Sequence, residues 1–435
     1  MRTVLSPIAA LLLSVAILVM GNGLQQTLLP VRASLESFDA LEIGLMGSAY
    51  YLGFVLGCVR GGRLIQRVGH IRAFTALAAI ASTVALVHAL SVQPYMWTLM
   101  RALTGFCFAG LYLVIESWLN DKADNTNRGF IMGIYTMVNL SVIVAGQMML
   151  TLADPQQFPL FALASILVSI AAVPVALTAS PQPAPLAEAR LRPIRLYRLS
   201  PVGVVGVFLV GITNGAFWAL GPAYAAGIGA GTDEIAIFMS IAVMGGALAQ
   251  WPAGRLSDRF DRRFVLIGGC ILGIVGALGL VLVGGAGGWP LAALACLFGA
   301  AALPLYAICV AHAFDFVERK DLVEAASGLL LANGAGSVIG PMVAAGAMRE
   351  AGPAGLFACT AAFHLLLGGF ALWRMTRRTA LPAEARTGFD LTSTAQTMVA
   401  LEPQPPASEA PGEPSPPAGG LDPMPADGTE ERSPG

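Results

Sequence analysis

Polar side chains that could bind a solute occur inside long apolar runs of the sequence. Asn22, Gln25 and Gln26 lie three and four residues apart in the first run, so a helix would place them on one face. Asn214 and Trp218 repeat the spacing of four in a later run. Amides bind hydroxyls and carboxylates, and an indole offers a stacking face. The pattern predicts a cavity wall, although the same amides could instead bond neighbouring helices together.

Four ionisable residues form a second group of candidates. Arg101 lies inside an apolar run, and Glu116 follows fifteen residues later, about four helical turns, on roughly the same side. At a repeat shift of 196 residues, the partner of Glu116 is His312, which would face it across the pseudo-twofold and is followed three residues later by Asp315. Charged groups inside apolar runs are costly and often functional, and a carboxyl with an imidazole could exchange protons. The alternatives are that Arg101 bonds backbone carbonyls and that the others reach the membrane surface.

The composition indicates which class of protein positions these side chains. Of the 435 residues, 56% are hydrophobic and only 12% are charged, against roughly 45–50% and 25% in soluble proteins. A net charge of −1 with no basic block also disfavours a nucleic-acid binder. The apolar runs are about 20 residues long and do not alternate every second residue, which predicts helices rather than a membrane barrel.

The runs predict an all-α polytopic membrane protein with twelve transmembrane helices. Their expected bounds are about 6–30, 42–60, 72–91, 95–119, 129–152, 159–178, 200–224, 233–253, 264–283, 290–314, 325–348 and 354–373. Of the 25 basic residues, all but Arg32, Arg101 and Arg349 fall at the N-terminus, in alternate loops or in the tail. Because Lys and Arg favour the cytoplasmic side, both termini are predicted to be cytoplasmic.

The chain contains an internal repeat. A shift of 192 residues places Asn22-Gly23 on Asn214-Gly215 and Pro30 on Pro222, and it also aligns 62–64 with 254–256. Six helices followed by six related helices are therefore expected. The predicted parts are an N-terminal half (1–178), a cytoplasmic linker (179–199), a C-terminal half (200–373) and a Pro-rich disordered cytoplasmic tail (374–435).

Three motifs resemble one transporter family. The loop 254–263, GRLSDRFDRR, resembles the G-x-L-x-D-R-x-G-R-R/K signature of the major facilitator superfamily, and 101–105 resembles its R-x-x-x-G motif. The segments 116–120 and 327–341 look like its YcaD-like branch. This resemblance implies two six-helix halves around a midplane site. In the family, the arginine that matches Arg101 is usually linked to proton coupling or to helix contacts.

The two signature loops differ in charge. Gln66 stands where the family usually has Asp, whereas the second loop keeps Asp258 but has Asp261 where Gly is expected. The resemblance implies that the loop carboxylate helps to hold the outward-facing state from the cytoplasmic side. By the pseudo-twofold, Asp258 is expected to face the start of the fifth helix at Arg128-Gly129. The predicted gating residues are Gly62, Arg63, Gln66, Arg67, Gly254, Arg255, Asp258 and Arg259.

These observations predict a secondary active transporter of a small solute rather than an enzyme. The expected partners are a small-molecule substrate, the lipid bilayer and a coupling proton or ion, without nucleic acid, and the expected location is the cytoplasmic membrane. No sequence pattern indicates a metal site, ATP hydrolysis or another cofactor. The alternative is a non-transporting sensor or scaffold on a transporter fold that acts through its tail.

Overall fold

The computed structural model describes residues 8–123, 127–177, 183, 193–283, 285, 287–318 and 321–377. This part of the chain contains twelve helical spans that are long and apolar enough to cross a membrane, and it contains no strand. The all-α class with twelve spans is thus confirmed. The tail from residue 378 and most of the linker lie outside the described residues.

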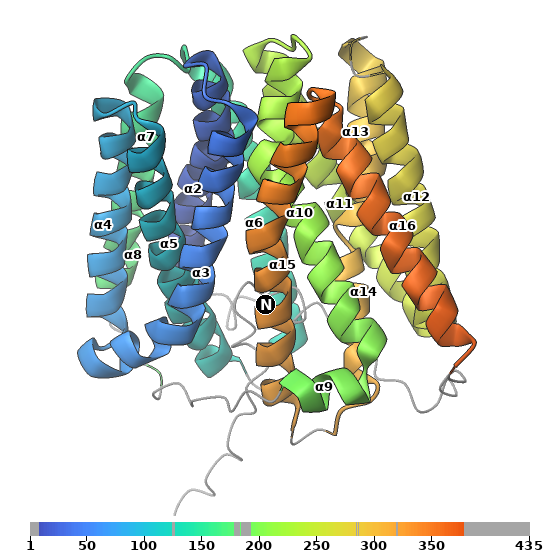
Figure 1. Cartoon of the computed structure of the whole chain (residues 1–435). Helices are drawn as coiled ribbons and strands as arrows, with labels where there is room; N and C mark the ends of the chain where they lie inside the picture. The colour runs from blue at the N-terminus through green and yellow to red at the C-terminus, as the bar shows by residue number, and fades with distance from the viewer. Residues whose placement is uncertain are drawn as a thin grey trace, which may run out of the picture. The chain divides into compact units, whose positions relative to one another are not determined.

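The first six spans come from the N-terminal half and lie together (Figure 1). Within this half α3 packs on α5, α2 on α6 and α7, and α4 on α5 and α7. Their bounds are α2 (Ala9–Leu35), α3 (Ala40–Val68), α4 (His70–Leu90), α5 (Pro94–Lys122), α6 (Arg128–Met148) with the 3-10 turn η2 (Met149–Leu152), and α7 (Pro159–Ile170) with α8 (Ala172–Ala176).

The last six spans repeat this arrangement in the C-terminal half. Here α10 packs on α15, α11 on α13, and α12 on α16. The bounds are α9 (Pro193–Leu199), α10 (Pro201–Gly227), α11 (Thr232–Arg259), α12 (Arg262–Val283), α13 (Gly288–Ala302), α14 (Leu305–Phe314), α15 (Leu322–Ala351) and α16 (Gly355–Met375). The short helix α9 occupies the end of the predicted linker, and Arg195 ties it to Asp321 at 2.7 Å.

The repeat is visible in how equivalent helices begin. Asp39 accepts from the Glu42 backbone at the start of α3, and the Glu42 carboxylate accepts from the Asp39 N–H at 2.8 Å. Glu234, which is 192 residues after Glu42, accepts from the N–H of Gly231 at 3.2 Å at the start of α11. Such caps satisfy N–H groups that have no partner inside the helix.

One predicted span is broken beside the cavity described below. The expected helix 290–314 is divided into α13 and α14 at Leu303 and Pro304. Proline lacks the N–H that would continue the ladder and clashes with the preceding turn. The break precedes Tyr306, which lies on the cavity wall.

The two halves meet through α2, α3, α6, α10, α11 and α15. We call the end where α3 begins the outer end and the opposite end, where α9 lies, the inner end; the inner end is the one predicted to be cytoplasmic. Near the outer end a β-carbon added to Gly44 would lie 2.5 Å from Ala345 Cβ and 2.8 Å from the Pro341 carbonyl oxygen. Gly47 likewise packs against Ala219 and Pro341. The backbones of α3 and α15 therefore nearly touch here, and we call this contact between the halves the outer gate.

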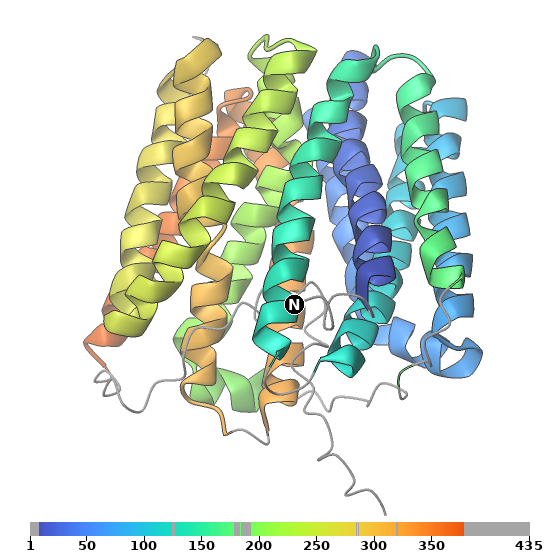
Figure 2. The same cartoon turned by 180° about the vertical axis from the view of Figure 1, so that it is seen from behind.

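The inner end is more open between the halves. A β-carbon added to Gly62 on α3 or to Gly129 on α6 would meet no atom of the described residues within 4 Å. Figure 2 shows α6 and α11 separating from each other toward the end at which α9 lies. Contact at the outer end combined with separation at the inner end leaves the space between the halves open toward the inner end.

Candidate substrate-binding cavity

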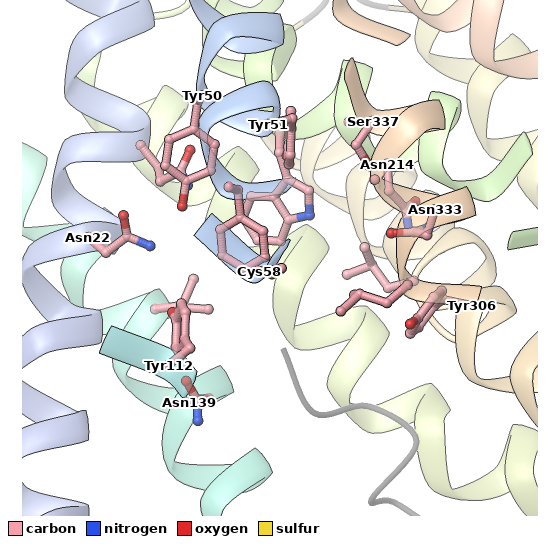
Figure 3. Close-up of a pocket in the computed structure, with 18 of the residues that line it drawn as sticks. Asn22, Tyr50, Tyr51, Cys58, Tyr112, Asn139, Asn214, Tyr306, Asn333 and Ser337 are labelled. Atoms are coloured by element: carbon pink, nitrogen blue, oxygen red, sulfur yellow. The ribbon is translucent and has the colours of Figure 1, made fainter. Parts of the chain in front are cut away.

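A cavity of about 300 Å³ lies between the two halves. Its wall is built by α2, α3, α5 and α6 from one half and by α10, α11, α14 and α15 from the other (Figure 3). The polar and aromatic lining residues are Asn22, Gln26, Tyr50, Tyr51, Phe54, Tyr112, Tyr135, Thr136, Asn139, Asn214, Trp218, Gln250, Tyr306, Asn333 and Ser337. This volume is at the lower end of the range for small-molecule sites, about 300–1,000 Å³.

Four of the five residues predicted to line a cavity lie on this wall: Asn22 and Gln26 from α2, and Asn214 and Trp218 from α10. Gln25 is buried on α2 but is not part of the wall. The Oδ1 atoms of Asn22 and Asn214 are buried without a hydrogen-bond partner in the described structure. These carbonyls are therefore available to accept hydrogen bonds from a bound solute.

The tyrosines of the wall were not singled out by the sequence argument. Of the eight tyrosines in the chain, Tyr50, Tyr51, Tyr112, Tyr135 and Tyr306 line the cavity. Tyrosine in a membrane helix usually lies at the membrane surface, where its hydroxyl reaches water. A tyrosine several turns from either end of a predicted span therefore indicates a polar environment inside the membrane, and the sequence contained this indication. The rings give the cavity aromatic surfaces with polar edges.

Further amides complete the wall. The Asn139 amide donates to the Tyr135 carbonyl at 2.9 Å, which leaves its Oδ1 buried and unpartnered. The Asn333 amide donates to the Val207 carbonyl at 2.9 Å, and the Tyr306 hydroxyl has no partner in the described part of the chain. No lining residue among those described is Asp, Glu, Lys or Arg. The wall itself therefore carries no formal charge.

Arg101 lies directly behind the wall. Its Nη2 donates to Gln26 Oε1 at 3.2 Å, and its guanidinium lies 4.2 Å from the centre of the Tyr50 ring. The residue is 5% exposed, and Nη1 has no hydrogen-bond partner in the described structure. Because a guanidinium can only donate, Gln26 must turn its carbonyl to Arg101 and keep its NH₂ for other partners.

Glu116 lies behind the wall nearer the inner end of α5. The side chain is fully buried, and the Tyr135 hydroxyl donates to its Oε1 at 3.0 Å. A cavity-lining hydroxyl therefore connects the solvent-accessible space to a buried carboxyl. The predicted pairing of Glu116 with His312 has no hydrogen bond or ion pair among the described residues, and the His312 ring packs on Phe316 instead.

Asp315 belongs to a different network at the inner end. Its carboxylate accepts from Arg262 Nε at 2.8 Å and from Nη2 at 3.3 Å, and both side chains are almost fully buried. Arg262 Nη1 also donates to Ser257 at 3.1 Å and lies 3.6 Å from Asp258. These contacts all lie in the C-terminal half, and they favour a structural role for Asp315.

The predicted gating residues occupy the inner ends of α3 and α11. Gln66, Arg67, Asp258 and Arg259 are exposed there. Arg255 stacks on Trp251, with 4.0 Å from the guanidinium carbon to the ring centre. At the predicted partner site on α6, Arg128 donates to Asn120 of its own half at 2.6 Å.

Asp261 replaces the glycine of the signature and binds its neighbour. Arg263 donates to its carboxylate from Nη2 at 2.7 Å and from Nε at 3.1 Å. Burial by itself raises the pKa of Asp261, but the hydrogen bonds and positive charge of Arg263 outweigh it and hold this pKa below its ordinary value. The unusual carboxylate is thus kept ionised by an arginine of the same motif.

The helical arrangement and the cavity between two related halves define a polytopic transporter fold. The family model of the Major Facilitator Superfamily matches residues 11–204 and 203–408, and the chain belongs to this superfamily. Its relatives support the YcaD-like branch, and the chain is a multi-pass inner-membrane protein that functions in transmembrane transport.

Three comparisons illustrate the similarity. An uncharacterized MFS-type transporter of Enterobacter sp. (strain 638) is 29% identical over 352 residues, which are 80% of this chain and 91% of that protein. The uncharacterized MFS-type transporter YcaD of Salmonella newport (strain SL254) is 26% identical over the same shares. Among solved structures, the nucleoside transporter NupG covers 86% of this chain and 100% of its own, with a TM-score of 0.74 and 13% identity.

Proposed function

We propose that the protein is a secondary active transporter that carries a small solute by alternating access. The observation that carries this proposal is the cavity itself, because residues from both halves line it while the outer gate is packed shut. Rocking of the halves would close the inner end and open the outer gate around the same wall. The structure would then correspond to the inward-open state, with both termini in the cytoplasm.

We further propose that transport is coupled to a proton or another ion. Tyr135 supports this, because its hydroxyl lines the cavity and binds the buried carboxyl of Glu116. Ionisable residues inside membrane spans commonly mark proton pathways. In the inward-open state, a proton could reach Glu116 from the cavity through the Tyr135 hydroxyl.

A solute uptake screen in proteoliposomes tests the transport proposal. Purified protein is reconstituted and uptake of a pooled solute library is measured with and without an imposed pH gradient. We expect accumulation of at least one solute above protein-free liposomes, and a larger accumulation with the gradient. If no solute in a broad library crosses faster than in protein-free liposomes, the transport proposal fails.

The rival function, a sensor or scaffold acting through the tail, is tested by deletion of residues 380–435. A transporter keeps most of its flux without these residues, because all the described residues of the cavity wall precede them. A sensor would lose its output while its fold is retained. The matched measurement is the amount of folded protein in the membrane for both chains.

A further inference from the structure

The charge behind the cavity wall points to the chemistry of the solute. Arg101 is 5% exposed, its Nη1 is unpartnered, and it forms no ion pair among the residues that the structure describes. Its two contacts, the carbonyl of Gln26 and the face of Tyr50, carry no negative charge. A buried cation is costly unless it is paired, so this arrangement leaves a positive site without its counter-ion.

Arg101 lies beneath the outer gate rather than at the open end of the cavity. A small void of about 10 Å³ borders it, and Ile43, Met46 and Gly47 of α3 line this void. Gln26 and Trp218 belong both to this void and to the main cavity. The void is at the lower limit for one water molecule, so an anion finds no room beside Arg101 until the gate residues separate.

The position of Arg101 under the outer gate would let it bind a solute in one state of the transporter and release it in the other. Opening of the outer gate would move α3 away from α10 and α15 and uncover the guanidinium toward the outer side. In the inward-open state the guanidinium is covered by the Tyr50 ring and bound to Gln26. Glu116, fifteen residues further along α5, lies about 22 Å away and does not neutralise Arg101.

The remainder of the wall suits a flat apolar body. Tyr50, Tyr51, Tyr112 and Trp218 give it aromatic faces, and the volume of about 300 Å³ suits a small molecule. A guanidinium binds a carboxylate in a planar, two-hydrogen-bond geometry. We propose that Arg101 binds the carboxylate of a small aromatic acid under the outer gate. The inference rests on the proposed transport function, whose substrate class it names.

Matched pairs of acids and neutral amides test this proposal. The probes are benzoate and benzamide, cinnamate and cinnamamide, and indole-3-acetate and indole-3-acetamide. Their binding to the full-length protein in detergent is measured by calorimetry. We expect at least one acid to bind about tenfold or more tightly than its amide, because hydrogen bonds to charged groups are stronger than neutral ones.

Two variants assign the preference to Arg101. Arg101→Gln is expected to bring acid and amide affinities within about twofold, while Arg101→Lys keeps part of the preference because it keeps the charge but loses the planar fork. Arg32→Gln is the matched control, because Arg32 is a cation at the outer end of α2 that pairs with Glu36. It should bind the probes as the wild type does.

Several results would overturn the proposal. The proposal fails if the wild type binds acid and amide equally or binds none of the six probes. It also fails if Arg101→Gln keeps the preference of the wild type for the acid. If Arg101→Gln does not fold, the acid and amide affinities of the wild type and of Arg101→Lys still test the proposal. Flux is measured separately in proteoliposomes: binding of an acid without flux contradicts the transport proposal alone, whereas flux of a neutral solute independent of Arg101 contradicts only the carboxylate inference.

Discussion

The hydroxyl of Tyr135 donates a 3.0 Å hydrogen bond to Glu116 and joins the cavity wall on α6 to a buried carboxyl on α5. Replacement of Glu116 by Gln keeps the size of the side chain but removes its titration. We predict that Glu116→Gln abolishes the acceleration of flux by a pH gradient while solute exchange without a gradient continues. Tyr135→Phe should weaken the same response only partly, because water can replace a hydroxyl in the path.

The measurement for this pair is flux in proteoliposomes with and without a pH gradient. Tyr306→Phe is the matched control, since the Tyr306 hydroxyl also lines the cavity but has no hydrogen-bond partner in the described part of the chain. A full response to the gradient in Glu116→Gln would show that another group carries the proton.

The buried pair Arg262 and Asp315 should contribute strongly to stability. Removal of one partner of a buried ion pair leaves the other charge uncompensated and costs about 3–5 kcal/mol. We therefore expect Asp315→Asn to lower the free energy of unfolding by an amount of this order, measured by unfolding in mixed micelles. The half-exposed pair Arg195 and Asp321 is the control, because disrupting such a pair costs roughly 0–1 kcal/mol. Equal effects at the two sites would contradict this assignment.

Asp261 gives a pH dependence with a definite sign. Its pKa is lower in the folded protein than in the unfolded chain, so its stabilising contribution is complete above the unfolded value of about 3.9. That contribution is lost as the pH falls through the lower, folded pKa. The stability difference between wild type and Asp261→Asn should therefore be constant from about pH 7 to pH 5 and shrink below about pH 4. A difference that grows on acidification would contradict the prediction.

The signature loops predict an unequal inner gate. Asp258 retains the carboxylate that Gln66 lacks, so the second-half loop is expected to hold the inner end closed in the outward-facing state. Asp258→Asn should then favour the inward-facing state and Gln66→Asp the outward-facing one. About 1.4 kcal/mol changes such a ratio tenfold. This ratio is measured from the distances between spin labels at the inner ends of the two halves. An unchanged distance distribution in Asp258→Asn would show that the loop does not control the gate.

Much of the fold could be predicted because the lengths of the apolar runs and the internal repeat can be read directly from the sequence. The shift of 192 that aligns Glu42 with Glu234 reappears in the structure, because each glutamate accepts from the backbone N–H three residues earlier at the start of its helix. The predicted helix ends were less accurate, because α3 continues to Val68, beyond the predicted end at 60. Polar and charged residues near a helix end do not stop a helix whose backbone bonds remain satisfied.

The candidate site could be predicted only in part. Asn22 and Asn214 were found because the repeat places amides at equivalent positions. The depth of the wall tyrosines inside the predicted helices set them apart from tyrosines at a membrane surface, but no periodicity shows whether such a ring faces a cavity or another helix. The contact of Arg101 with Gln26 joins residues 75 positions apart, and such a contact depends on helix packing that a single sequence does not specify.

The central claim is that the halves open alternately at the two ends, and the outer gate offers the most direct test. A valine at Gly44 would clash with Ala345 and Pro341 and should hold the gate open. The matched control is Gly346→Val on α15, next to Ala345, because a β-carbon there meets no atom within 4 Å among the described residues.

Spin-label pairs report both ends in reconstituted protein, one pair at Ser37 and Gly231 on the outer side and one at Gly129 and Phe260 on the inner side. In Gly44→Val the outer distance should lengthen while the inner distance shortens, and in Gly346→Val both should remain as in the wild type. Outer and inner distances that stay unchanged in Gly44→Val, or that increase together, would contradict alternating access.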